Sequence, residues 1–116
     1  MSFRIRRVYE PASAADGIRV LVDRLWPRGL KKVDARLTHW MREVAPSPRL
    51  RQWFGHAPER FSEFRSRYEA ELRSNPALAR LRQLGSRSRV TLLYAARDPD
   101  TNHAVVLLSF LRKRGA

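Results

Sequence analysis

Two short runs of apolar residues, far apart in the chain, constrain the fold more than any other feature of this sequence. Residues 20–22 (VLV) lie in a predicted strand over 18–25, and residues 90–96 (VTLLYAA) form the second predicted strand. A strand without a polar face is usually covered on both sides, as in a parallel sheet. Parallel strands need a long crossover, and the segment between these two runs has helical periodicity. The sequence therefore predicts an α/β fold.

The segment between the two runs also carries residues that begin and end helices. Asp34 is placed to cap a helix whose apolar face continues to Val44 and which ends at a proline. Ser47 before a proline, with Gly55 seven residues after that proline, predicts a short helix between them. We expect the remaining helices over 58–73, over 75–85 with an end at the glycine, and from 102 to 111.

A further strand is predicted at the start of the chain, over residues 3–9. Its direction stays open, because only a short polar turn separates it from the next strand. A chain of 116 residues suffices for one domain and is too short for two. We expect a single three-layer domain over 1–116, with a small, mostly parallel sheet of about three strands flanked by helices.

Several classes of protein are excluded by composition. The chain has no cysteine, which excludes a disulfide scaffold, a zinc-thiolate site and a thiol nucleophile. No apolar run approaches the roughly 20 residues that span a bilayer. Residues 1–7 are polar and arginine-rich, unlike a secretory signal. We therefore expect a soluble, cytoplasmic protein with no membrane partner.

The charge of the chain is strongly positive. Lys and Arg number 24 against 11 Asp and Glu, which gives a net charge of +13 and a pI near 11.6. Such a balance usually indicates a polyanionic partner. Only three of the basic residues are lysines, however, and an arginine bias of this kind also follows from a GC-rich genome. The charge is spread evenly over both halves, so we expect any nucleic-acid binding to be weak and non-specific.

A candidate site follows from the predicted sheet, because open parallel sheets bind ligands beyond the carboxyl ends of their strands. Residues 23–29 (DRLWPRG) follow one apolar strand, and residues 94–98 (YAARD) end the other and lead into the last helix. Arginines there offer bidentate donors to a phosphate or carboxylate, and the helix start offers free N–H groups. The predicted ligand-binding residues are Arg24, Trp26, Arg28, Tyr94, Arg97, Asp98 and Asn102.

Two residues at the same place have side chains suited to proton transfer. Asp23 and His103 are the candidate catalytic acid–base groups. Each candidate also has a structural interpretation: Asp23 as an ion-pair partner, Asn102 as a helix cap and Trp26 as a packing residue. The three histidines lack metal-ligand spacing, so we expect neither a metal nor a cofactor.

Three segments of the chain resemble the YeaO-like branch of the DUF488 family. They are residues 22–29 (VDRLWPRG), 50–56 (LRQWFGH) and 92–98 (LLYAARD), within a resemblance that runs from about residue 4 to residue 111. The resemblance implies a small, stand-alone bacterial α/β protein of undefined function. Many members of the wider family resemble this pattern but carry cysteines at the strand end and at the next helix start. The chain has none there, so the resemblance carries over the place of the site and no thiol chemistry.

These observations support three hypotheses about function. The first is an anion-binding pocket at the strand ends, used by a small-molecule hydrolase or acid–base enzyme. The second is a non-catalytic nucleic-acid-binding or stress-response accessory protein that uses its arginine-rich surface. The third is a protein-interaction module. A strand-end pocket with buried arginines favours the first, a flat arginine face with exposed aromatic side chains the second, and an exposed apolar patch beside residues 26–29 (WPRG) the third. The oligomeric state does not follow from the sequence.

Overall fold

All four strands of the sheet run parallel. The computed structural model describes residues 2–114 and places the strands in the order β1-β4-β2-β3. In that order the strands are Ser2–Arg7, Arg89–Tyr94, Ile18–Leu21 and His39–Trp40. The α/β fold and the parallel sheet are confirmed. The sheet has four strands, one more than the expected number.

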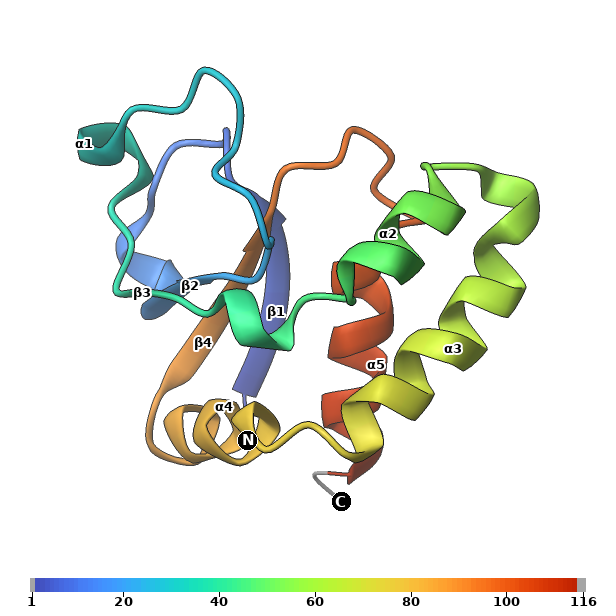
Figure 1. Cartoon of the computed structure of the whole chain (residues 1–116). Helices are drawn as coiled ribbons and strands as arrows, with labels where there is room; N and C mark the ends of the chain where they lie inside the picture. Colours follow the sequence, from blue (N-terminus) through green and yellow to red (C-terminus); the bar gives the residue numbers. More distant parts are fainter. Residues whose placement is uncertain (1, 115–116) are drawn as a thin grey trace.

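Helices α4 and α5 pack on one face of this sheet, and on the same side α3 packs against α5 and α2 against α3 (Figure 1). Helices α3 and α5 lie side by side, and α4 packs against β4 and β1. A further helix, α1, has a single turn, and three short 3₁₀ turns complete the described elements. The α-helices are α1 (Lys32–Ala35), α2 (Pro48–Phe54), α3 (Phe61–Arg73), α4 (Ala77–Arg87) and α5 (His103–Arg114); the 3₁₀ turns are Ala14–Asp16, Arg42–Val44 and Pro58–Arg60.

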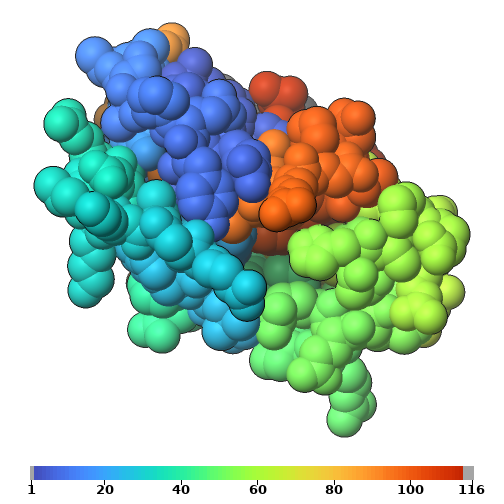
Figure 2. Space-filling view, turned by 90° about the horizontal axis from the view of Figure 1, so that it is seen from above, coloured from blue at the N-terminus to red at the C-terminus, as the bar shows by residue number. Residues whose placement is uncertain are grey.

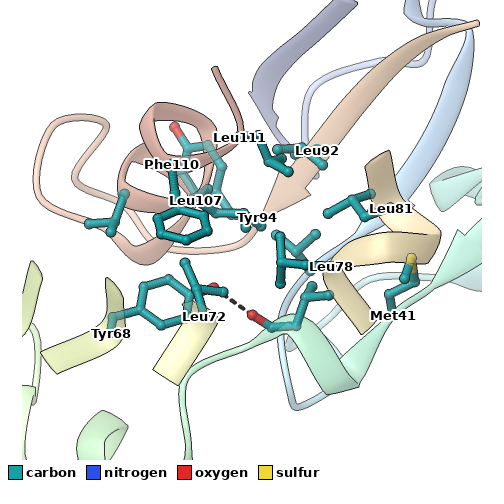
Figure 3. Packing of buried hydrophobic residues seen from close by; sticks show 14 of the residues in the cluster. Met41, Tyr68, Leu72, Leu78, Leu81, Leu92, Tyr94, Leu107, Phe110 and Leu111 are labelled. Atoms are coloured by element: carbon teal, nitrogen blue, oxygen red, sulfur yellow. Dashed lines mark hydrogen bonds between the residues drawn. The ribbon is translucent and has the colours of Figure 1, made fainter. Parts of the chain in front are cut away.

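The larger core lies between the sheet and these helices (Figure 3). Leu92 and Tyr94 project from β4 toward apolar side chains of α4 and α5. Tyr68 of α3 is fully buried, and its hydroxyl donates to the carbonyl of Val44 at 2.5 Å. That bond satisfies the phenol, whose burial raises its pKa well above the ordinary value. Other labelled members of this core are Met41, Leu72, Leu78, Leu81, Leu107, Phe110 and Leu111.

The opposite face of the sheet is covered by the chain between β2 and β3. Leu21 and Leu93 project to this side and pack against side chains of that segment. Apart from the single turn of α1, the covering segment has no helix. The second outer layer is therefore a packed loop, and its apolar contacts come from Trp26, Leu30, Leu37 and Trp40.

The fourth strand lies where the sequence predicted a helix from Asp34 to Val44, and that prediction is wrong. The chain leaves α1 at Arg36, whose backbone is in the left-handed region at φ 46°. The Thr38 amide then donates to the carbonyl of Arg19 at 2.8 Å. Leu37 and Trp40, which suggested a helical face, instead contact the sheet from an extended segment, and Val44 ends a 3₁₀ turn.

The predicted ends of the other helices are largely confirmed. The Ser47 hydroxyl accepts from the amide of Leu50 at 3.2 Å, and Gly55 closes α2 in the left-handed region at φ 52°. The predicted end of α4 at Gly85 is wrong, because the helix continues to Arg87. This glycine is required by close packing: a Cβ on Gly85 would lie 2.2 Å from Cζ of Phe3. No helix within residues 2–114 is long and apolar enough to cross a membrane.

Candidate functional site

The ends of β2 and β4 meet at one edge of the sheet, as expected. The two strands are hydrogen-bonded neighbours, and Asp23 follows β2 directly beside the end of β4. Its Oδ2 accepts from the amide of Ala95 at 3.1 Å, and its carbonyl accepts from the indole of Trp40 at 2.7 Å. The predicted meeting of Asp23 with the segment after β4 is confirmed.

An open cleft of about 940 Å³ lies at this edge of the molecule. Figure 2 shows the hollow, viewed from above, between the blue N-terminal segments, the orange segment after β4 and the green region of α2. Its walls combine basic, acidic and apolar side chains. The lining residues are Arg7, Tyr9, Asp23, Arg24, Leu25, Arg28, Ala45, Pro46, Arg51, Phe54, His56, Phe64, Ala95, Ala96, Arg97, Asp98, Asn102 and His103.

The two candidate acid–base groups lie in contact in this cleft. Nε2 of His103 is 3.1 Å from Oδ1 of Asp23 and also 3.1 Å from the carbonyl oxygen of Val22. Both side chains are 16% exposed. A carbonyl oxygen only accepts hydrogen bonds, so this contact places a proton on Nε2 of His103. In the neutral imidazole Nδ1 is then the basic nitrogen.

Two of the arginines in the cleft donate hydrogen bonds to backbone carbonyls of the segments that form its walls. Arg24 donates to the carbonyls of Pro46 and Ala45 at 3.1 and 3.3 Å, which ties the loop after β2 to the segment before α2. Arg7 donates to the carbonyl of Ala96 at 3.1 Å, and its guanidinium lies 4.7 Å from the ring centre of Tyr9. Their donors are therefore partly occupied by the protein itself.

Three further arginines present free guanidinium groups. Arg28, Arg51 and Arg97 are exposed, and their side chains make no hydrogen bond or ion pair with any residue of 2–114. They come from three separate segments: the loop after β2, helix α2 and the loop after β4. Arg28 and Arg97 were predicted from the sequence, whereas Arg51 was not.

The loop between β4 and α5 is built by Asp98 and Asn102. Oδ1 of Asp98 accepts from the amides of Asp100 and Thr101 at 2.8 and 3.2 Å, and Oδ2 accepts from the Thr101 hydroxyl. The Thr101 hydroxyl and the Asp100 amide hold the pKa of Asp98 below its ordinary value. Asn102 caps α5, because its Oδ1 accepts from the amide of Val105 at 3.0 Å. Both side chains thus fix the loop that carries Arg97.

Trp26 and Tyr94 do not line the cleft, although both were predicted to bind a ligand. The indole N–H of Trp26 donates to the carbonyl of Leu30 at 2.8 Å. The ring packs edge-on against that of Trp40, with 5.3 Å between the ring centres. Tyr94 is 5% exposed in the helical core, and burial raises its pKa. The structure places both residues in packing roles that hold the segments around the cleft.

Several cleft residues lie away from the strand ends, so the sequence did not predict them as part of the site. Arg51, Phe54 and His56 belong to α2 and the turn after it, opposite the strand ends. His56 has a left-handed backbone at φ 59°, which is uncommon for a residue other than glycine. Two sequence features lie at these positions: Gly55, which predicted a helix end, and the family-like segment 50–56, to which no site was assigned. Among the described residues, no three His, Asp or Glu side chains gather as a metal site would require.

Comparison with known proteins places the chain in a family. A family model described as "Inactive DUF488-N3 subclade" matches residues 2–116. An uncharacterised protein of Mycobacterium tuberculosis is 51% identical over 111 residues, which cover 96% of this chain and 94% of that protein. The uncharacterised protein YeaO of Escherichia coli is 43% identical over 113 residues, 97% and 98% of the two chains. No solved structure gives a significant match. The chain therefore belongs to the inactive DUF488-N3 subclade of the DUF488 proteins.

Proposed function

We propose that the cleft binds a small phosphate- or carboxylate-bearing compound without transforming it. The observation that carries the proposal is the set of three exposed arginines, Arg28, Arg51 and Arg97, which line one cleft and whose side chains have no partner among residues 2–114. Five arginines and two aspartates line the cleft, so its formal charge is +3 with neutral histidines. Guanidinium groups bind phosphate and carboxylate oxygens in pairs, and an anion there would supply the missing acceptors.

Binding accounts for the cleft better than catalysis does. The Asp23–His103 contact places a base beside a carboxylate, but the lining residues include no serine, threonine or cysteine to act as a nucleophile. Asp23 is also engaged with the amide of Ala95, which gives it a structural role. The word "inactive" in the description of the subclade points the same way. A proton-transfer reaction on bound water is the remaining enzymatic alternative, and it predicts turnover of an activated phosphate ester that Asp23→Asn abolishes.

Removal of single arginines tests the binding proposal. We expect Arg51→Gln and Arg97→Gln to melt at the temperature of the parent, because these exposed side chains have no partner to lose. Added phosphate or sulfate should raise the melting temperature of the parent, since a ligand at 100 times its Kd stabilises the folded state by about 2.7 kcal/mol. The two variants should gain clearly less from the anion.

Arg49→Gln is the matched control for general charge effects. Arg49 is exposed on α2, two residues before Arg51, and does not line the cleft. Its removal changes the net charge equally and should leave the anion effect unchanged. Equal loss in Arg49→Gln and Arg51→Gln would show that the anion acts on the overall charge, and the proposal would then fail.

A nucleic-acid-binding role is the second candidate, and the observation that favours it is the net charge of +13. It needs no pocket, because phosphate contacts from a dispersed basic surface give weak, salt-dependent binding. A protein partner is a third candidate that the exposed Leu25 beside the cleft would serve. The cytoplasmic location expected from the sequence is part of the same proposal.

A further inference from the structure

We infer that the ligand of this cleft is an aromatic phosphate monoester, in which a flat apolar body is joined to a dianionic head. This inference rests on the proposed anion binding and adds the chemical class of the ligand. Three observations carry it: the size of the cleft, the position of the exposed apolar side chains and the charge of the lining.

The cleft is much larger than a bare anion requires. Clefts that enclose drug-sized ligands have volumes of about 300–1,000 Å³ and walls that are mostly apolar. The volume of about 940 Å³ lies near the top of that range. Besides the arginines, the lining includes the buried Phe54, Phe64 and Pro46 and two alanines after β4. An inorganic phosphate would fill only a small part of this volume, so the ligand has an organic body.

Exposed large apolar side chains are concentrated at this cleft. Within residues 2–114 three such side chains are exposed: Leu25 at 58%, Tyr9 at 39% and Val33 at 74%. Leu25 and Tyr9 both line the cleft, and Val33 does not. Apolar surface left exposed beside a basic cleft is what the apolar part of a ligand would cover. The free guanidinium groups also offer flat faces, on which an aromatic ring packs well, whereas one face of the Tyr9 ring already lies under the Arg7 guanidinium.

The charge of the lining selects the head group. A formal charge of +3 exceeds what a single carboxylate would balance. A phosphate monoester carries about −1.5 to −2 charges at pH 7 and three acceptor oxygens, which suits several guanidinium groups at once. The free side chains of Arg28, Arg51 and Arg97 are the expected contacts of the head, with the ring toward Leu25 and Tyr9.

Calorimetric titration of the full chain with four probes tests the inference. The probes are inorganic phosphate, glycerol 3-phosphate, phenyl phosphate and adenosine 5′-monophosphate. We expect at least one of the two aromatic esters to bind about tenfold or more tightly than both non-aromatic probes. Phenyl phosphate carries its phosphate directly on the ring, whereas the nucleotide carries it on a sugar. The ester that binds more tightly therefore shows which of these two kinds of aromatic phosphate the cleft prefers.

Leu25→Ser and Val33→Ser form the matched pair of variants. Both replace an exposed aliphatic side chain, so neither is expected to impair folding. Leu25→Ser should weaken the aromatic ester about five- to tenfold and leave inorganic phosphate unchanged, while Val33→Ser should change neither. Equal affinity for all four probes, or equal effects of the two variants, would overturn the inference and leave anion binding standing. Binding of none of the probes would overturn the proposed function as well.

Discussion

Asp16 offers the sharpest test of how the loop-covered face of the sheet is held together. Its side chain is fully buried and has four donors. Oδ1 accepts from Arg6 at 2.9 Å and from Arg4, and Oδ2 accepts from Arg19 at 2.5 Å and from the amide of Ser13 at 3.0 Å. One carboxylate therefore joins the turn before β2 to guanidinium groups on two strands.

The cost of Asp16→Asn follows from these contacts. Removing one partner of a buried ion pair costs about 3–5 kcal/mol, because the other charge stays buried. Arg19 is almost fully buried, but the side chains of Arg4 and Arg6 are 38% and 22% exposed, so water compensates part of their loss. We therefore expect Asp16→Asn to lower the free energy of unfolding by about 3 kcal/mol. At roughly 4 °C per kcal/mol, this lowers the melting temperature by about 12 °C.

The same contacts predict how this contribution depends on pH. Burial alone would raise the pKa of Asp16, but the Ser13 amide and the guanidinium groups of Arg6 and Arg19 hold it well below its ordinary value. Because the folded pKa is the lower one, the stabilisation is present above the unfolded pKa of about 3.9 and is lost as the pH falls toward the folded pKa. The difference in stability between the parent and Asp16→Asn should be constant from about pH 7 to 5 and smaller at about pH 3.

Urea unfolding followed by circular dichroism at several pH values measures this difference. Glu63→Gln is the control, since the exposed Glu63–Arg67 pair contributes at most about 0.5 kcal/mol. A cost of Asp16→Asn below about 1 kcal/mol at pH 7 would refute the argument from burial. A difference that is undiminished at about pH 3 would refute the argument from the pKa.

The close packing of Gly85 and the dispersed positive charge lead to two other predictions. Gly85→Ala should destabilise the chain by about 1–2 kcal/mol despite the better helix propensity of alanine, because its Cβ would meet the ring of Phe3, and Phe3→Leu should recover part of that loss in the double variant. A neutral Gly85→Ala in thermal melts would contradict the close contact. Binding to labelled single-stranded DNA should be weak, independent of sequence and steeply reduced by salt, because the charge is dispersed. Tight binding to one sequence that persists at about 0.2 M salt would instead favour a nucleic-acid reader.

The parts of the fold that the sequence predicted are those with local causes. The apolar runs of β2 and β4 have no polar face, so they had to be buried on both sides. The ends of α2 follow from Ser47 and Gly55, whose hydrogen bond and left-handed backbone act within one helical turn. Such features need no knowledge of the rest of the chain.

The fourth strand could not be predicted, because its cause is not local. It has two residues, His39 and Trp40, and pairs with β2 only because the loop after β2 folds back over the sheet. The spacing of Leu37 and Trp40 fits a helical face equally well. Contact with the sheet selected the extended form, and nothing in the segment itself indicates that contact.

The candidate site likewise has one part that the sequence predicted and one part that it did not. Residues at the ends of β2 and β4 could be predicted to meet, because neighbouring parallel strands end at one edge. Arg51 on α2 and His56 in the turn after it also line the cleft, and their position depends on how that helix packs against the rest of the chain. Sequence reasoning that starts from strand ends therefore finds one wall of the cleft and misses the opposite wall.

Folding explains some of the cleft residues and leaves others unexplained, and that division bears directly on function. The Val22 amide donates to the carbonyl of Leu93, and the next donor at the end of β4, the amide of Ala95, is satisfied by Asp23. Asp23 thus continues the pairing of the two strands where the sheet ends, so its presence needs no catalytic reason. Arg24 and Asn102 likewise bind backbone groups of the cleft walls. No such contact within residues 2–114 accounts for the three exposed arginines, which makes them the residues on which ligand binding should depend: Arg28, Arg51 and Arg97.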